Sequence, residues 1–379
     1  MIRTVDTVVI GGGTMGSMIT WRLSARGQQV MCLESHDIAH SRSAVAGDTR
    51  LFRMSYRGKY DLFPILREAQ TQWQTLNEES GEDILVNTGG IYIGHTNGDY
   101  IPELINCCER NYLDFEHLSA WEVQERFPQH NLKEDESAVL EHSAGFLRTE
   151  RAVHAAFSQA RRYGAITKPG TKAVNIEEKP DGVTITTSTG IIVADRAVIA
   201  AGLGTTKLLP RELQDALEAR REILTWFPVI NPTSYNSSNF PIFAHIDNSH
   251  SAYGAPSIDG STFKATLDGR AKPIKDFPNN SYTLTPQEIA ESEETADRFF
   301  NDIYPQVSRQ ECLADLYTPD KQALVGRLPD SDSVHVATGF SGTGFKMASG
   351  VGELIAQSIT EQNDSMLPDF WDPSRFYNN

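Results

Sequence analysis

The sequence has little cysteine and no excess of basic residues, and each shortage excludes a class of protein. Its 379 residues include only four cysteines, Cys32, Cys107, Cys108 and Cys312, and no two of them form a CxxC pair. A disulfide framework and a structural zinc site are therefore not expected. The formal net charge of −16 would repel the phosphates of a nucleic acid, so no nucleic-acid partner is expected either.

Long hydrophobic runs are also missing. No apolar stretch approaches the roughly 20 residues that a membrane-spanning helix needs, so no membrane partner is expected. The first apolar strand follows the N-terminus almost at once, so we expect no signal peptide and predict a cytoplasmic protein. With 39% hydrophobic residues, a chain of this length can form two domains with cores of their own, as a monomer or small homo-oligomer.

Glycine is concentrated where the first strand is expected to turn into a helix. The spacing of Gly11, Gly13 and Gly16 predicts a tight turn and a helix over about 15–25, with phosphates bound at its N-terminus. The next apolar run ends in Glu34, which is placed to bind the ribose hydroxyls of an adenosine and would repel a 2′-phosphate. The alternative is a glycine-rich turn that binds nothing.

Two further patterns of strand, glycine and turn occur later in the chain. A strand over 197–201 ends at Gly202, and a strand over 334–338 leads through the glycine-rich turn 339–346 into an apolar helix. Between them, residues 222–285 are rich in aromatics and short β-like runs, which predicts a separate sheet. Other expected elements are an extended loop over 40–50, helices over 60–77 and 151–163, a turn and strand over 87–94, and a strand around 183–186.

Three such segments converging on one ligand suit a large dinucleotide better than a nicotinamide cofactor. The expected fold class is α/β, or α+β overall, with a Rossmann-like dinucleotide-binding domain interleaved with a substrate domain built on a mainly antiparallel sheet. The expected division assigns 1–86, 146–218 and 323–379 to the first domain, and 87–145 and 219–322 to the second.

Five motifs follow one another along nearly the whole chain. They are residues 11–16 with Glu34, Gly47-Asp48-Thr49-Arg50, Gly254-Ala255-Pro256-Ser257 with Lys264, Tyr317-Thr318, and Gly339-Phe340-Ser341-Gly342-Thr343-Gly344-Phe345-Lys346. In this order they resemble the flavin-dependent amine oxidases that include monomeric sarcosine oxidase, N-methyltryptophan oxidase and the fructosyl amino acid oxidases (amadoriases). The resemblance implies FAD as the cofactor and oxidation of a secondary amino acid to an imine that hydrolyses, with O₂ reduced to hydrogen peroxide.

The resemblance also implies roles for single residues. Arg53 and Lys346 match the cations that hold the substrate carboxylate, and Lys264 matches a lysine over the flavin whose charge promotes oxygen reduction. Arg50 and Tyr317 match residues near the flavin ring and in the active site. Arg53 and Lys346 have a plainer alternative as surface charges, and Tyr317 has one as a core residue. Cofactor contacts are implied for Gly11, Gly13, Thr14, Met15, Gly16, Glu34, Ser43, Asp48, Thr49, Arg50, Gly202, Gly339, Gly342, Thr343, Gly344, Phe345 and Lys346.

The chain departs from the family pattern at the position that carries the flavin linkage. Many members attach FAD through a cysteine two residues before the tyrosine that matches Tyr317, and this chain has Asp315 there. The nearest thiol, Cys312, would point to the opposite face of a strand. Noncovalent FAD is therefore expected, and the alternative is a bulge that brings Cys312 to the flavin ring.

A second departure lies four residues after Lys264, where sarcosine oxidases have a histidine and this chain has Asp268. An acid there would attract the substrate's ammonium group or bind sugar hydroxyls, and amadoriases also have an acid at this position. Asp268 is therefore expected to act in catalysis and in substrate binding. The alternative is that Asp268 pairs with Arg270 in a solvated turn.

These features favour an FAD-dependent oxidase of N-substituted amino acids, with fructosyl amino acids preferred over sarcosine and other N-methyl amino acids. One alternative is a flavin amine dehydrogenase that gives its electrons to a carrier other than O₂. A second alternative is a binding protein that keeps the nucleotide fold without turnover, although four retained cations argue against it. A nicotinamide-dependent dehydrogenase fits the opening motif alone.

Overall fold

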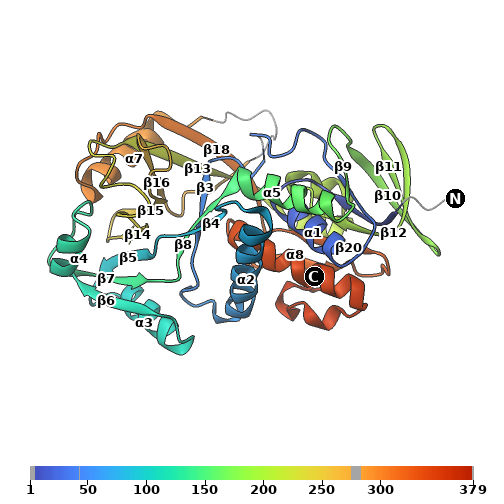
Figure 1. The fold of residues 1–379 in the computed structure, drawn as a ribbon, viewed down its shortest axis with the longest axis horizontal. Helices are drawn as coiled ribbons and strands as arrows, with labels where there is room; N and C mark the ends of the chain where they lie inside the picture. The colour runs from blue at the N-terminus through green and yellow to red at the C-terminus, as the bar shows by residue number, and fades with distance from the viewer. Residues whose placement is uncertain (1–4, 42, 275–282, 378–379) are drawn as a thin grey trace.

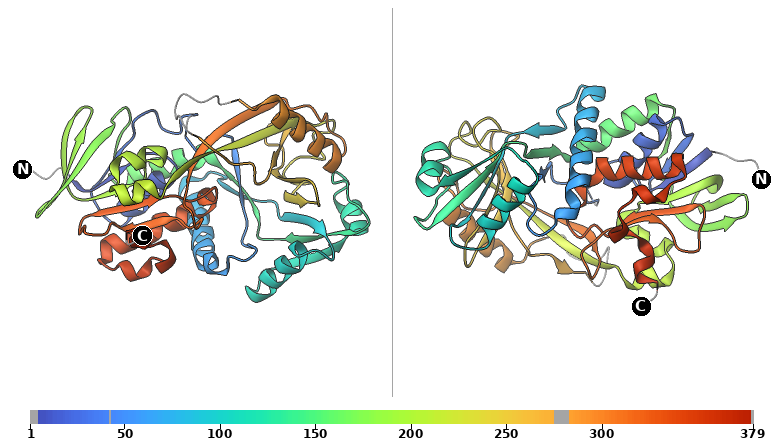
Figure 2. Two further views of the ribbon diagram at one scale, coloured as in Figure 1. Left: turned by 180° about the vertical axis from the view of Figure 1, so that it is seen from behind. Right: turned by 90° about the horizontal axis from the view of Figure 1, so that it is seen from below.

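The computed structural model describes residues 5–41, 43–274 and 283–377, and the chain forms two large sheets at opposite ends of an elongated molecule (Figure 1). The first sheet lies with helix α1 (Thr14–Ala25), and the second lies with helix α7 (Pro286–Phe299). Helix α2 (Phe63–Ser80) and a small sheet of β3 (Thr49–Phe52), β8 (Gly145–Arg148) and β4 (Leu85–Asn87) lie between them (Figure 2).

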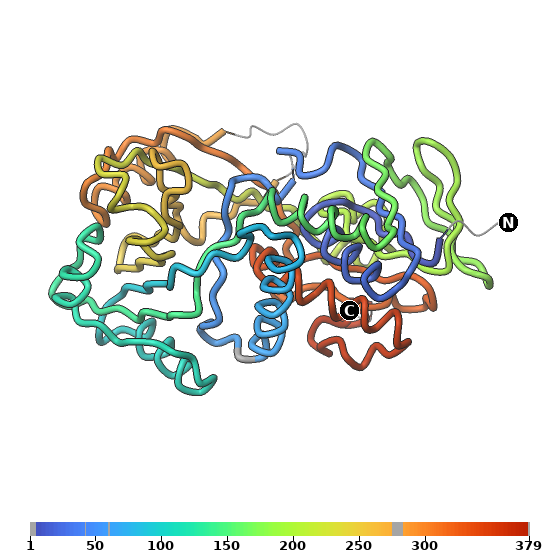
Figure 3. The backbone as a smooth tube through the Cα atoms, in the orientation of Figure 1, coloured from blue at the N-terminus to red at the C-terminus, as the bar shows by residue number. Residues whose placement is uncertain are grey.

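The first sheet is built from three separated parts of the chain, which Figure 3 shows as blue, green and red segments side by side. Its parallel core runs in the order β20, β12, β1, β2, β9, with the antiparallel hairpin β10–β11 added at β12 and β19 added at β20. Five of the six residues of strand β1 are buried, because helices cover the core of the sheet. The strands are β1 (Val5–Ile10), β2 (Val30–Leu33), β9 (Ile166–Lys168), β10 (Ala173–Lys179), β11 (Gly182–Thr187), β12 (Gly190–Ile199), β19 (Leu324–Arg327) and β20 (Val334–Thr338).

The second sheet is antiparallel except where β14 pairs with β5. Its strands are β5 (Gly90–His95), β6 (Phe115–Ser119), β7 (Glu136–Glu141), β13 (Glu218–Pro228), β14 (Ile242–Ile246), β15 (Ser251–Ala255), β16 (Thr262–Leu267), β17 (Lys272–Pro273) and β18 (Arg309–Tyr317). The remaining helices are α3 (Tyr100–Arg110), α4 (Ala120–Arg126), α5 (Thr149–Arg162), α6 (Arg211–Asp215), α8 (Gly344–Glu361) and the 3₁₀ helices Tyr60–Leu62, Gly202–Leu208, Asp364–Met366, Asp369–Trp371 and Pro373–Phe376.

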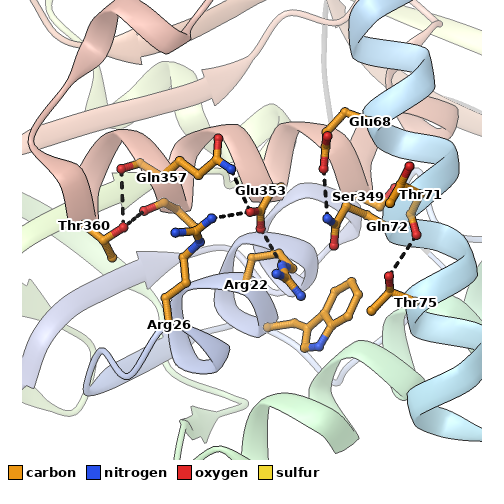
Figure 4. Close-up of polar contacts among 12 residues, drawn as sticks. Arg22, Arg26, Glu68, Thr71, Gln72, Thr75, Ser349, Glu353, Gln357 and Thr360 are labelled. Carbon is orange, nitrogen blue, oxygen red and sulfur yellow. Dashed lines mark hydrogen bonds and ion pairs between the residues drawn. The ribbon is translucent and has the colours of Figure 1, made fainter.

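Helix α8 packs along α1 and α2, and a buried carboxylate joins α8 to α1 (Figure 4). Glu353 accepts hydrogen bonds from Arg22 Nε at 2.6 Å and from Arg26. Burial alone would raise the pKa of Glu353, but the two guanidinium groups lower it below its usual value. The ion pairs therefore fix α1 against α8, and with them the two turns that precede these helices.

The structure confirms the expected α/β class, with a Rossmann-like parallel sheet and a mainly antiparallel second sheet. The prediction of a loop over 40–50 is wrong at its end, because Thr49 and Arg50 begin β3. They pair with β8, which lies far away in sequence. Residues 275–282 of the aromatic-rich stretch lie outside the described residues. The domain boundaries remain predictions. Within the described part of the chain, no helix is both long and apolar enough to cross a bilayer.

Candidate active site

The turn after β1 has the geometry that a bound pyrophosphate needs. Gly11 has a φ of +106°, and a Cβ there would lie 2.4 Å from the carbonyl oxygen of Ala200, so only glycine fits. Helix α1 begins at Thr14 without a side-chain cap, and a Cβ on its N-cap residue Gly13 would meet nothing within 4 Å. The uncapped N–H groups and the open backbone at Gly13 fit the phosphates of a dinucleotide.

Glu34 lies at the end of β2 beside this turn. Its buried carboxylate accepts hydrogen bonds from the backbone N–H groups of Gly12 at 2.7 Å and His36 at 2.9 Å. These bonds hold the carboxylate where the ribose of an adenine dinucleotide would lie along the start of α1. The structure thus places Glu34 next to the glycine-rich turn.

A second helix N-terminus meets the first at the turn between β20 and α8. Helix α8 begins at Gly344 after its N-cap residue Thr343, and that N-terminus also has no side-chain cap. The Met15 side chain of α1 lies 3.0 Å from where a Gly344 Cβ would stand. The backbone N–H of Gly342, whose φ is +77°, donates to Asp315 at 2.8 Å. Two glycine-rich turns and their helices therefore adjoin, as binding of one long cofactor requires.

Lys264 and Arg50 hold the segment 44–49 through its backbone carbonyls. Lys264 is only 2% exposed, and its Nζ donates to Gly47 O at 2.5 Å and to Thr49 O at 2.7 Å. Arg50 donates to the carbonyls of Ala44, Ala46 and Thr49 at 2.8–3.1 Å. Burial, together with the charge of Arg50, lowers the pKa of Lys264 well below its usual value. The lysine is thus fixed in place, and its charge depends on its surroundings.

Arg53 and Lys346 meet around one tyrosine. The guanidinium carbon of Arg53 lies 4.6 Å from the ring centre of Tyr56, and Lys346 Nζ lies 5.2 Å from the same centre. Burial would raise the pKa of Tyr56, but the charges and hydrogen bonds of Lys346 and Arg53 lower it to about 7. Lys346 is buried and Arg53 half-buried, so neither is an ordinary surface charge. The arrangement concentrates positive charge at one place and suits a carboxylate ligand.

Tyr317 faces a half-buried carboxylate that the sequence analysis did not single out. Its hydroxyl donates to Glu222 of β13, and both groups lie against Gly342, where a Cβ would be 2.7 Å from Tyr317 Oη and 3.2 Å from Glu222 Oε1. Asp315 precedes Tyr317 on the same face of β18 and accepts the hydrogen bond from Gly342. Burial raises the pKa values of Glu222 and Asp315 above their usual range.

Cys312 lies on the other face of β18. It packs with Ile223, Leu267 and Leu284, and accepts a weak hydrogen bond from Arg221 at 3.8 Å. The strand runs regularly against β13 from Arg309 to Tyr317, without the bulge that would turn this thiol toward Asp315.

Asp268 follows β16 and is exposed. Its charge acts on the pKa values of Tyr100, Tyr253 and Glu222, which places it at the edge of this group of residues. The alternative pairing with Arg270 is not what the structure shows, because Arg270 forms its ion pair with Glu291 at 3.2 Å.

Other residues with expected cofactor contacts are spread around these groups. Asp48 pairs with Arg309 at 2.5 Å, and the Ser43 hydroxyl donates to His40 O at 2.9 Å. The Phe345 ring stacks on Trp73 with 6.0 Å between centroids, so its side chain serves the packing of α2 against α8. Gly16 packs against Gly11, and Gly202 and Gly339 follow strands β12 and β20 of the first sheet.

The sequence analysis missed two residues, Tyr56 and Glu222. Glu222 lies on the same strand face as the buried Leu224 and Trp226. The alternation of side chains along the strand could therefore have indicated that this acid faces the protein interior. Tyr56 lies in a stretch without regular structure, three residues after Arg53, and nothing in its spacing indicates Lys346 as a neighbour.

Comparisons with known proteins agree with this geometry. A family model described as FAD dependent oxidoreductase (DAO) matches residues 6–358. The chain is similar to monomeric sarcosine oxidase of Streptomyces avermitilis, with 30% identity over 99% of this chain and 98% of the relative. It is 28% identical to N-methyl-L-tryptophan oxidase of Escherichia coli over 93% and 94% of the two chains. Its fold matches NikD, described as an unusual amino acid oxidase essential for nikkomycin biosynthesis, with a TM-score of 0.86, 19% identity and 98% of each chain covered.

Proposed function

The chain belongs to the family of FAD-dependent oxidoreductases, and on this premise we propose that it oxidises N-methyl and related secondary amino acids with O₂ as electron acceptor. The observation that carries the proposal is the pair of cations, Arg53 and Lys346, around Tyr56 near two helix N-termini that fit a dinucleotide. A guanidinium fork and an ammonium at one place are suited to the carboxylate of an amino acid.

FAD is the cofactor of this family, and the residues present fit it. We propose that the turn 11–16 and Glu34 hold its adenosine and pyrophosphate, and that the turn 339–346 and Arg50 lie along the flavin. The chemistry that FAD would supply there is acceptance of the hydride equivalent from the C–H bond beside the substrate nitrogen and transfer of two electrons to O₂, which would give hydrogen peroxide. The protein's own residues orient the substrate and supply the charges around it.

The relatives favour a different substrate from the one that the sequence analysis preferred. The two relatives reported above are a sarcosine oxidase and an N-methyl-L-tryptophan oxidase, whose names specify N-methyl amino acids. The preference for fructosyl amino acids depended on Asp268, which is exposed at the edge of the residue group. N-methyl amino acids are therefore the substrate class proposed here.

A substrate panel tests the proposal. The FAD-loaded protein is incubated in air with sarcosine, N-methyl-L-tryptophan, fructosyl-glycine and fructosyl-valine, with glycine as a primary-amine control, and peroxide is measured. The expected result is more peroxide from an N-methyl amino acid than from either fructosyl compound. Peroxide from the fructosyl compounds alone would restore the other substrate class. Bleaching of the flavin without air, but little peroxide in air, would identify a dehydrogenase.

The flavin is expected to be released when the protein is denatured. Cys312 is buried on the face of β18 opposite Asp315, and burial raises its pKa, which disfavours the thiolate that a covalent link requires. After acid precipitation, the yellow colour should therefore stay in the supernatant. Yellow colour in the pellet would contradict this expectation, and loss of that colour in Cys312→Ser would identify the attachment point.

Replacing Tyr56 with phenylalanine should remove a pH dependence of carboxylate binding. The pKa of Tyr56 is lowered to about 7, so above that pH its phenolate neutralises Arg53 and Lys346 and competes with a carboxylate ligand. The Kd of wild type for propionate should rise between pH 6 and pH 9, by up to about tenfold per pH unit. In the variant the Kd should stay nearly constant. The change in flavin absorbance on titration with propionate measures both.

Tyr100→Phe is the matched control. Tyr100 also faces Arg53, but burial raises its pKa, so its hydroxyl stays neutral over this pH range and its loss should leave the wild-type slope. The same slope in Tyr56→Phe and wild type would show that another group titrates.

A further inference from the structure

The pair formed by Glu222 and Tyr317 adjoins the glycine-rich turn that leads to Lys346. The two residues come from neighbouring strands, β13 and β18, and project from the sheet face that also carries Trp226 and Leu313. On that face, Trp226 lies under Lys264, whose Nζ is 4.9 Å from the ring centre. At the other end of the face, the pair touches Gly342, in the turn that leads to Lys346. Glu222 therefore lies between Lys264 and the start of helix α8, which carries Lys346.

The charges around Glu222 leave it without a direct cationic partner. Asp315 and Tyr317 face it from β18, Tyr253 from β15, Arg50 from β3, and Asp268 from the end of β16. The nearest cation on the same face of its strand, Arg220, pairs with Glu218 at 2.5 Å and lies over the Tyr317 ring, and the adjacent Arg221 pairs with Glu288. Across residues 5–41, 43–274 and 283–377, no lysine or arginine forms an ion pair with Glu222. Such a half-buried carboxylate, with no paired cation, attracts a positively charged ligand atom.

The proposed reaction needs a proton acceptor at this end of the substrate. A secondary amine is an ammonium ion at neutral pH, and its nitrogen cannot support loss of a hydride from the adjacent carbon while the lone pair holds a proton. Tyr56 is unsuited to this role, because Arg53 and Lys346 beside it would repel an ammonium group. Lys264 donates to two carbonyl oxygens and has Arg50 as a neighbour, which also disfavours a cation there.

We propose, on the basis of the proposed function, that Glu222 is a catalytic residue that holds the substrate's ammonium group and takes one proton from it. The N–H bond breaks, its electron pair stays on nitrogen, and an O–H bond forms on the Glu222 carboxylate. The neutral amine then lies beside a neutral carboxylic acid, which returns the proton to water after the product leaves. Tyr317 is a positioning residue, because its hydrogen bond fixes the carboxylate.

The test is the pH profile of flavin reduction in Glu222→Gln. Glutamine keeps the size of the side chain and an oxygen that accepts from Tyr317, but it takes no proton at these pH values. The holoenzyme is mixed without air with the N-methyl amino acid that the substrate panel identifies, from pH 7 to pH 10. At pH 7 the variant should reduce its flavin about 10²-fold more slowly than wild type, as expected for loss of a general base. The difference should shrink with rising pH, because water then deprotonates the amine.

Glu218→Gln is the matched control, since Glu218 lies on the same face of β13 but is exposed and should leave the rate within about twofold, as surface substitutions do. A wild-type rate in Glu222→Gln, or the same loss at every pH, would overturn the proposal. If no secondary amine reduces the wild-type flavin, the proposed function fails instead, which is a different result.

A binding measurement on the wild-type holoenzyme tests the proposal even if Glu222→Gln does not retain FAD. Trimethylglycine carries a fixed positive charge beside its carboxylate, whereas propionate carries only the carboxylate. As the pH falls from 9 to 6, protonation of Tyr56 should tighten binding of both carboxylates. Protonation of Glu222 removes the charge that attracts the quaternary ammonium group, so trimethylglycine should gain less affinity than propionate. The same change in Kd for both ligands would overturn the proposal.

Discussion

Replacing Lys264 with methionine should slow the reaction of the reduced holoenzyme with O₂ by about 10²–10³-fold, while reduction by substrate without air changes only a few-fold. Lys264 is 2% exposed, and two backbone carbonyls and the Trp226 ring fix its ammonium group. A fixed cation stabilises the negative charge that develops on dioxygen as it accepts the first electron. Methionine has a similar length without charge, and stopped-flow mixing with air-saturated buffer measures the rate.

The charge of Lys264 gives this prediction a pH dependence. Burial and Arg50 lower its pKa, so the ammonium form is present below that lowered pKa and is lost as the pH rises through it. The oxygen reaction of wild type should therefore become slower with rising pH, and that of Lys264→Met should show no such decline. A wild-type rate in Lys264→Met would favour the dehydrogenase alternative.

Arg309→Met is the matched control for this experiment. The Arg309 guanidinium carbon lies 4.3 Å from the centre of the same Trp226 ring, but its side chain is 42% exposed and pairs with Asp48 and Glu311. Water screens such a charge, so this variant should keep the oxygen rate within about threefold. Equal losses in the two variants would mean that the packing of Trp226, and not the charge of Lys264, sets the rate.

Local sequence patterns predicted the parts of the molecule that depend on neighbouring residues. The turn at Gly11 and the strand before it follow from glycine spacing and a β-branched run, and both lie within a few residues of each other. Glu34 is found in the same way, since it ends the next strand of the βαβ unit. The structure differs at Thr49 and Arg50, whose pairing with β8 depends on a partner far along the chain.

Contacts between segments that are far apart in the sequence could not be predicted from it. Tyr317 and Glu222 are 95 residues apart, and their hydrogen bond depends on the pairing of β13 with β18. Tyr56 acquires its low pKa from Lys346, which reaches it only because α8 packs against α2. Alternation identifies the face on which a side chain lies, but not which residue of another strand or helix lies opposite.

Removal of the Arg53 side chain should strongly reduce oxidation of an N-methyl amino acid. In Arg53→Ala, kcat/KM for an N-methyl amino acid should fall by about 10²–10³-fold, because losing one partner of a desolvated, hydrogen-bonded charge pair costs about 2–5 kcal/mol. Arg53 stays charged, because Tyr56, Tyr100 and Tyr92 raise its pKa although burial opposes this. Arg53→Lys should recover part of the loss, because it keeps the charge but not the planar fork. Steady-state peroxide formation measures all three proteins.

A substrate that lacks the carboxylate shows whether Arg53 binds that group. N-methylbenzylamine has the secondary amine but no carboxylate, so wild type and Arg53→Ala should oxidise it with similar kcat/KM. Arg57→Ala is the matched control, because Arg57 follows in the same loop, is exposed and pairs with Glu103 at 3.2 Å. It should lose less than about threefold on either substrate. If Arg53→Ala loses as much on N-methylbenzylamine as on the amino acid, Arg53 supports the fold of the site, and Lys346 alone is left to hold the carboxylate.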